Sequence, residues 1–202
     1  EGSYDIGMSS RELKEEEASE LNRHVLAIDG IAVIVNPTNE VKDLSMEQIL
    51  KIYTGDITNW KDVGGKDGKI TVVTREEGSG TRGAFIELTK IETKEAGDQT
   101  VASAITQGST GAVITTVAGD PNAIGYASFG SVKISSDIKM IGVNGKECTE
   151  ENIYSGDYKI ARPFLMVTKA EPIGLAKAFL EFILSPEGQE IVGKHNYLKV
   201  TK

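Results

Sequence analysis

Residues 69–90 read KITVVTREEGSGTRGAFIELTK and join a predicted strand to a predicted helix. The first part, KITVV, is rich in β-branched residues, which favour a strand. The last part, IELTK, favours a helix. Glycines and hydroxyl residues crowd the turn at 78–81, and Arg75 stands before it, at the expected end of the strand. The segment is therefore a strand–turn–helix unit, the building block of an α/β fold.

The chemistry of this turn suits a tetrahedral oxyanion. A helix N-terminus presents backbone N–H groups and the positive end of the helix dipole. Gly80 lets the backbone approach a ligand closely, and Ser79 and Thr81 add hydroxyl groups. Arg75 can add a charged, two-pronged contact. The alternative is a Gly-Ser turn that only caps the helix.

Nucleotide-binding motifs fit this turn poorly. A Walker A loop needs a lysine after its last glycine, whereas Gly80 is followed by Thr81 and Arg82. Gly78, Gly80 and Gly83 match a G-x-G-x-x-G dinucleotide fingerprint, but the acidic residue expected further on is missing. The dinucleotide interpretation stays open on this single match.

Glu77 stands close to the predicted anion site, where a negative charge is unexpected. It can pair with Arg75 and orient the guanidinium. It can equally be one of two solvated acids, together with Glu76.

Outward from this unit, strand and helix signals alternate and predict an α/β architecture with a mostly parallel sheet. Capping patterns predict helix starts at Ser9, Ser45, Ser109, Thr149 and Ser185. Asp29-Gly30 predicts a turn that divides segment 24–36 into two strands, and segment 96–107 is predicted as a polar helix. Further strands are predicted at 4–8, 123–128 and 162–169.

Composition excludes several classes of function. The net charge of −8 argues against nucleic acid as a partner. One cysteine, Cys148, rules out a disulfide within the chain, and His24 and His195 show no metal-ligand spacing. We therefore expect no metal, no cofactor and no histidine-based catalysis and assign no catalytic residues, while a carboxylate site stays open as an alternative. No apolar run reaches the roughly 20 residues of a membrane span.

Five segments carry a family resemblance in order along the chain: DIGMSSRELKEEE, GIAVIVNPTNEVKDLSMEQILKIYTGDITNWKDVGG, TVVTREEGSGTRGAF, GDPNAIGYAS and RPFLMVTK. Together they resemble the phosphate-binding proteins of high-affinity phosphate ABC transporters, over nearly the whole chain. The resemblance implies a two-lobed, class II periplasmic-binding-protein fold whose lobes are joined by two hinge strands and close on phosphate. It implies a first lobe at 1–34 and 162–202 and a central lobe at 35–161.

The resemblance also implies the site residues. Arg75, Ser79, Gly80 and Thr81 would contact phosphate, and Glu77 would orient the arginine. Ser10 stands where well-studied relatives have an aspartate that accepts the proton of monohydrogen phosphate. A hydroxyl can donate or accept, so this departure puts discrimination against sulfate in doubt.

The chain starts at a point that lies some way into the family's sequence, which predicts an incomplete first lobe with exposed core surface. Either the sequence is shortened, the protein is cleaved, or a separate N-terminal fragment or second chain completes the lobe. We expect the chain alone to bind phosphate weakly or not at all.

The function implied is that of a non-catalytic, extracytoplasmic solute-binding protein, lipid-anchored in its full-length form, which delivers inorganic phosphate to a membrane permease. Two alternatives remain: an enzyme that uses the same anion site, such as a phosphohydrolase or phosphotransferase, and a fragment with no ligand of its own.

Overall fold

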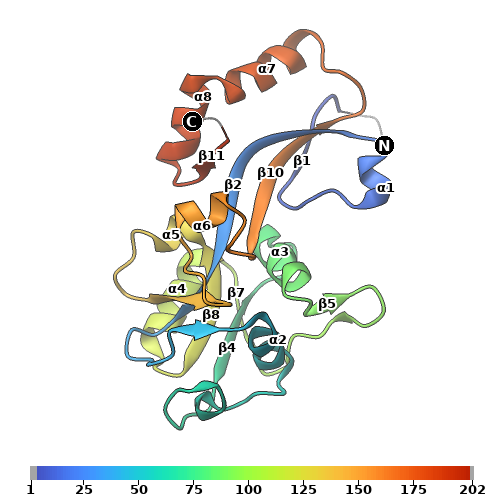
Figure 1. The fold of residues 1–202 in the computed structure, drawn as a ribbon. Helices are drawn as coiled ribbons and strands as arrows, with labels where there is room; N and C mark the ends of the chain where they lie inside the picture. The colour runs from blue at the N-terminus through green and yellow to red at the C-terminus, as the bar shows by residue number, and fades with distance from the viewer. Residues whose placement is uncertain (1–3, 201–202) are drawn as a thin grey trace. The chain divides into compact units, whose positions relative to one another are not determined.

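The computed structural model describes residues 4–200, and the chain forms two compact units (Figure 1). Unit 1 comprises Glu1–Asp29 and Arg162–Lys202, and unit 2 comprises Gly30–Ala161. The ends of the expected first lobe, residues 1–3 and 201–202, lie outside the described residues. The first boundary falls between Asp29 and Gly30, earlier in the chain than the 34/35 boundary implied by the resemblance.

Unit 2 holds the α/β pattern, and its elements alternate along the chain (Figure 1). Its strands are the second half of β2 (Asn22–Val35), β3 (Asp43–Leu44), β4 (Thr71–Arg75), β5 (Glu92–Thr93), β6 (Gly97–Asp98), β7 (Ile105–Gln107), β8 (Ala123–Ser128) and β9 (Lys139–Val143). Its helices are α2 (Met46–Thr54), the 3-10 helix η1 (Trp60–Val63), α3 (Gly80–Leu88), α4 (Thr110–Gly119), α5 (Phe129–Val132) and α6 (Glu150–Tyr154). The α/β prediction is confirmed.

The sheet of unit 2 is mixed rather than mostly parallel. Strand β4 pairs in parallel with both β7 and β8, as strands connected through helices do. The long strand β2 enters from unit 1 and pairs antiparallel with β8 and β9. Helices α3 and α4 both pack on β4 and β8.

Local caps explain where the helices of unit 2 begin. Ser45 accepts a hydrogen bond from the Gln48 N–H at 3.0 Å, and the Gln48 side chain accepts from the Ser45 N–H, which confirms the predicted capping box. Helix α2 ends at Thr54 and is capped by Gly55, whose φ of 87° suits glycine. Ser109 and Thr149 cap α4 and α6 as predicted.

The polar helix predicted at 96–107 is wrong, because this segment holds β6, a turn and β7. The Asp98 carboxylate accepts hydrogen bonds from both the N–H and the hydroxyl of Thr100, which holds a turn. The Val101 N–H donates to the Tyr53 carbonyl at 2.7 Å, a contact with a distant helix. Side-chain and tertiary hydrogen bonds thus replace the helical ones.

Strand β2 runs without interruption through Asp29-Gly30, so the turn predicted there is wrong. Gly30 is a site of close packing. A Cβ atom added to it would lie 2.4 Å from Ile153 Cδ1 and 3.4 Å from Cys148 Sγ. A glycine inside a strand can mark such a close approach as well as a turn.

Unit 1 is built from β1 (Gly7–Ser9), α1 (Glu15–Ala18), the first half of β2, β10 (Ala161–Thr168), α7 (Gly174–Leu184), α8 (Pro186–Lys194) and β11 (Leu198–Lys199). Strand β1 pairs antiparallel with β10, and β11 pairs antiparallel with β2. Ser185 caps α8, and Pro186 is its first residue, as predicted.

The helix predicted to start at Ser9 is wrong. Ser9 belongs to β1, where it lies opposite Leu165, and its hydroxyl bonds to the backbone of Arg11. The helix begins only at Glu15, where Glu17 accepts hydrogen bonds from the Lys14 N–H and the Arg11 guanidinium. Ser9, which the capping pattern assigns to a helix start, is instead part of the pairing between β1 and β10.

Unit 1 carries much exposed apolar surface. Only Leu180 of α7 is buried, whereas Leu175 of the same helix is 90% exposed. The other large apolar side chains exposed on this unit are Tyr4, Met8, Ile173, Phe179, Phe182, Ile191 and Tyr197.

None of the helices in residues 4–200 combines the length and the apolar character that a membrane-spanning helix needs.

Candidate functional site

The predicted anion-binding turn lies between β4 and α3 of unit 2. Strand β4 ends at Arg75, and α3 begins at Gly80. Ser79 is the N-cap: its side chain accepts a hydrogen bond from the Arg82 N–H at 3.3 Å. Gly78 has a φ of 85°, which favours glycine. The structure thus places Arg75, Ser79, Gly80 and Thr81 on one short turn at a helix N-terminus.

The Arg75 side chain is held on two sides. Its Nε donates to Glu76 Oε2 at 2.7 Å, and its Nη2 donates to Glu76 Oε1 at 2.8 Å. Its Nη1 donates to Thr110 Oγ1 at 2.9 Å. The Arg75 side chain is only 12% exposed. The guanidinium is therefore a fixed charge at the end of the strand.

The carboxylate on Arg75 differs from the one implied by the resemblance. Glu77 was expected to orient the guanidinium, but the structure pairs Arg75 with Glu76. The reason lies in the backbone. Strand β4 ends at Arg75, and the Ser79 N–H donates to the Glu76 carbonyl, so a turn begins at Glu76. The alternation of side chains along a strand, which would put residues 75 and 77 on one face, stops there.

A buried tyrosine fixes the backbone of the same residue. The Tyr126 hydroxyl accepts a hydrogen bond from the Arg75 N–H at 3.2 Å and is hydrogen-bonded to the Thr74 hydroxyl at 2.9 Å. Tyr126 is 1% exposed, and its ring stacks on Phe85 of α3 with centroids 4.0 Å apart. This contact joins the end of β4 to α3 and β8.

Sequence reasoning missed Thr110 and Tyr126. A signal for Thr110 existed, because segment 105–112, ITQGSTGA, repeats the strand–small residues–helix pattern of the Arg75 turn. The predicted helix at 96–107 hid the strand in it. Because β4 and β7 are parallel, with Arg75 opposite Gln107, both turns lie at the same edge of the sheet. Ligands of α/β proteins bind at this carboxyl edge.

The charges of the turn are strongly coupled. The hydrogen bond from Arg75 lowers the pKa of Glu76 to about 2, and the same contact raises the pKa of Arg75. Burial raises the pKa of Tyr126, so its hydroxyl is neutral at pH 7. Arg82, in the first turn of α3, pairs with Asp98 of β6. The turn therefore carries two cations, each with a carboxylate partner.

Ser10 belongs to unit 1, just after β1. Its carbonyl accepts a hydrogen bond from Arg162 Nη1 at 3.4 Å. Arg162 in turn pairs with Asp29 at 3.3 Å. Unit 1 thus holds the segment of Ser10 through a buried arginine.

Side chains that could bind a metal ion do not gather in the described part of the chain. Residues 4–200 contain no cluster of His, Cys, Asp and Glu that could hold a metal ion. His24 Nε2 lies 3.1 Å from the Thr168 hydroxyl, and Cys148 is 5% exposed in the core.

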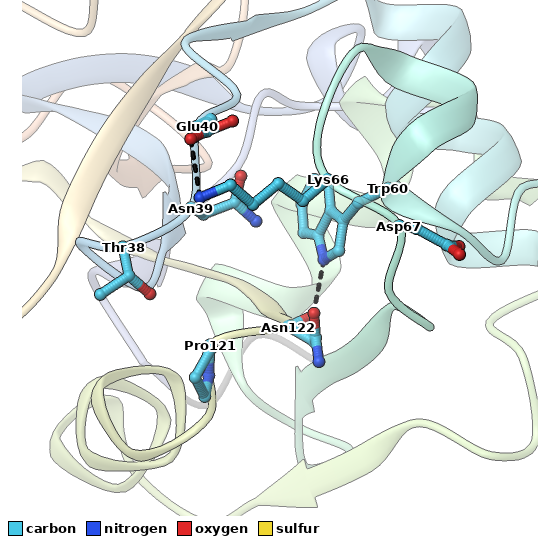
Figure 2. Close-up of a pocket in the computed structure, with 8 residues that line it drawn as sticks. All are labelled: Thr38, Asn39, Glu40, Trp60, Lys66, Asp67, Pro121 and Asn122. Carbon is cyan, nitrogen blue, oxygen red and sulfur yellow. Dashed lines mark hydrogen bonds and ion pairs between the residues drawn. The ribbon is translucent and has the colours of Figure 1, made fainter.

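A pocket of about 230 Å³ lies elsewhere in unit 2 (Figure 2). Trp60 donates its indole N–H to the Asn122 carbonyl at 2.9 Å, and Lys66 pairs with Glu40 at 2.8 Å. None of the lining residues belongs to the turn at 75–81. Of the three charged residues in Figure 2, the cation Lys66 pairs with Glu40, and Asp67 adds a second negative charge, so the pocket shows no charge arranged for an anion.

Comparisons with known proteins bear on this turn. The PBP superfamily domain matches residues 1–187. The phosphate-binding protein PstS of Bacillus subtilis is 38% identical over 205 residues, covering 100% of this chain and 66% of the relative. PstS of Borreliella burgdorferi is 33% identical, covering 98% of this chain and 73% of the relative. The chain thus spans about two thirds of the length of the Bacillus relative, and a match to PstS 2 of Streptococcus agalactiae covers 46% of that protein.

Solved structures agree. A phosphate ABC transporter substrate-binding protein from Clostridium perfringens, solved with bound phosphate, is 44% identical with a TM-score of 0.82, covering 99% of this chain and 81% of that one. A phosphate transport receptor from Vibrio cholerae is 37% identical with a TM-score of 0.91, covering 98% and 80%. The chain therefore belongs to the PBP superfamily and, within it, to the family of PstS phosphate-binding proteins.

Proposed function

We propose that this chain acts as a non-catalytic solute-binding protein that binds inorganic phosphate for import by an ABC transporter. The observation that carries the proposal is the Arg75 turn, in which a fixed guanidinium stands beside the N-terminus of α3. Relatives named phosphate-binding proteins, one of them solved with bound phosphate, support the choice of anion.

The proposed phosphate contacts in unit 2 are the Arg75 guanidinium, the hydroxyls of Ser79 and Thr81, and the backbone N–H groups that open α3 at Gly80. Charge-assisted hydrogen bonds of this kind offset the large cost of dehydrating the anion. From unit 1 we propose Ser10 as a further contact. Because a serine hydroxyl can donate as well as accept, we expect weak discrimination between monohydrogen phosphate and sulfate.

We propose that units 1 and 2 are the two lobes of the binding protein, and that β2 and β10 are its hinge strands. The arginine-orienting role implied for Glu77 passes to Glu76 in this proposal, because Glu76 is the residue that pairs with Arg75. The proposed partner is the membrane permease of a phosphate ABC transporter, and the proposed location is outside the cytoplasm with a lipid anchor. A separate N-terminal fragment has no support in the comparisons and is not part of the proposal.

Calorimetric titration with phosphate tests the function. Arg75→Ala should weaken binding by about tenfold to a hundredfold, because a charged hydrogen bond contributes about 1.5–3 kcal/mol. Arg23→Ala is the matched control, since it removes the same charge from an exposed pair with Glu12 in unit 1. Unchanged affinity in Arg75→Ala would remove Arg75 from the site.

The titration should be run on the 202-residue chain, which we expect to bind phosphate weakly. Submicromolar binding would contradict this expectation, and turnover of a phosphoester would contradict the non-catalytic role.

A further inference from the structure

The hydrogen bonds of Arg75 leave a defined set of donors. A guanidinium has five N–H groups: one on Nε and two on each Nη. Glu76 takes the one on Nε and one on Nη2, and Thr110 takes one on Nη1. One N–H then remains on each Nη. When Thr110 accepts the Nη1 hydrogen that points away from Nη2, the two remaining N–H groups are parallel and can bind two oxygens of a phosphate group at once.

Thr110 is well placed to fix this arrangement. It is the first residue of α4, just after the cap Ser109, whose hydroxyl accepts from the Ala112 N–H at 3.1 Å. The preceding strand β7 pairs with β4, and the Glu76 N–H donates to the Gln107 carbonyl at 3.2 Å. Backbone hydrogen bonds therefore hold the segment before Thr110 against strand β4 and Glu76.

Neither partner alone holds both ends of the guanidinium. Glu76 accepts from Nε and Nη2, but its side chain is 38% exposed, and the recorded hydrogen bond of Nη1 goes to Thr110 instead. Thr110 is the described partner of Nη1, from a different helix. Without its hydroxyl, Nη1 would turn to solvent or to another acceptor, and its second N–H would lose a fixed direction.

We propose that Thr110 is a positioning residue of the anion site, whose hydroxyl fixes Nη1 of Arg75 so that one N–H of each Nη faces the ligand. The inference rests on the proposed function and extends the site from the turn before α3 to the first turn of α4. It concerns the direction of the Arg75 donors, so Thr110 needs no contact with phosphate itself.

Three substitutions test the hydroxyl in phosphate titrations. Thr110→Val keeps the shape of the side chain and removes the hydroxyl, and should weaken phosphate binding by about tenfold, the loss of a hydrogen bond of about 1.4 kcal/mol. Thr110→Ser keeps the hydroxyl and should stay within about twofold of the wild type. Thr116→Val is the matched control, because Thr116 lies on the same helix and bonds to Gln107 and Ala112. The proposal is overturned if Thr110→Ser or Thr116→Val weakens phosphate binding as much as Thr110→Val does.

A measurement without ligand separates this inference from the proposed function. Side-chain NMR of Arg75 reports exchange between its two Nη signals, which is slow when both ends of the guanidinium are held. Exchange should be faster in Thr110→Val and unchanged in Thr110→Ser and Thr116→Val. If no form of the protein binds phosphate, the proposed function fails while this readout still decides the role of Thr110. Equal exchange rates in the wild type and Thr110→Val would refute the positioning role.

Discussion

At the end of β4, Arg75 and Glu76 form an ion pair, and its effect on the pKa of Glu76 can be measured. The hydrogen bond from Arg75 lowers the pKa of Glu76 from 4.5 to about 2. We predict that Glu76 stays ionised down to about pH 2 and that Arg75→Ala returns its pKa towards 4.5. Carboxyl signals of Glu76 in an NMR titration check this.

The sign of the effect on stability follows from the lowered pKa. The contribution of the Glu76–Arg75 pair is fully present above pH 4.5 and is lost as the pH falls towards 2. Glu17 is the internal control, because its pKa is also lowered to about 2, by Arg11 in unit 1. Its titration should not change in Arg75→Ala. An ordinary pKa for Glu76 in the wild type would contradict the pairing.

Single residues also show where sequence reasoning stops. Ser79 was predicted as part of a helix N-terminus because a cap depends on residues within one turn of the chain. The partner of Arg75 depends on where β4 ends and the turn begins, which the letters EE at 76–77 do not reveal. Tyr126 reaches the site from another strand, with no local pattern to indicate it, whereas the pattern at 105–112 that indicates Thr110 was hidden by the helix predicted at 96–107.

At the scale of elements, glycines within α8 differ in what surrounds them. A Cβ atom at Gly188 would lie 2.2 Å from the Phe182 carbonyl oxygen and 2.5 Å from that of Ile183, both backbone atoms of α7. A Cβ atom at Gly193 would meet only the flexible end of Lys199. The first position is thus closed by backbone, and the second by a side chain that can move away.

We predict opposite effects for the same substitution in this helix. Gly188→Ala should lower the free energy of unfolding by about 1–3 kcal/mol through overpacking. Gly193→Ala should be neutral or raise it by up to about 1 kcal/mol, because alanine favours a helix. Urea unfolding of both variants measures the difference. Similar values for the two would mean that the corner between α7 and α8 adapts easily.

Elements defined by local signals were predicted well, and those defined by distant contacts were not. The starts of α2, α4, α6 and α8 follow from their caps. Residues 96–107 look helical by composition but are held by Tyr53 and by their own side chains. Strand β2 passes through Asp29-Gly30 and pairs with β11 before these residues and with β8 after them, and Gly30 lies close to Ile153, a residue far along the chain.

At the scale of the whole molecule, the chain crosses between the two units twice, once at Asp29-Gly30 and once at Ala161-Arg162. Unit 1 is discontinuous, which periodicity and caps cannot predict, and only the family resemblance led to that expectation. Asp29 is the last residue of unit 1 on β2, and Arg162 is its first residue on β10. Their side chains pair at 3.3 Å and are 1% and 6% exposed. Arg162 also lies 5.0 Å from the centre of the Phe164 ring.

We predict that the Asp29–Arg162 pair makes a large contribution to the free energy of unfolding. Removing one partner leaves a buried charge without its counterion, so Asp29→Leu and Arg162→Met should each lower the free energy of unfolding by about 3–5 kcal/mol. The double variant should recover most of that loss, because two apolar side chains can replace a buried pair. The exposed pair of Arg23 and Glu12 is the control, where Arg23→Met should cost at most about 1 kcal/mol. Urea unfolding of the four variants completes the cycle. If Asp29→Leu or Arg162→Met lowers the free energy of unfolding by no more than Arg23→Met does, solvent reaches the pair, and backbone pairing rather than this ion pair stabilises β2 and β10 at these residues.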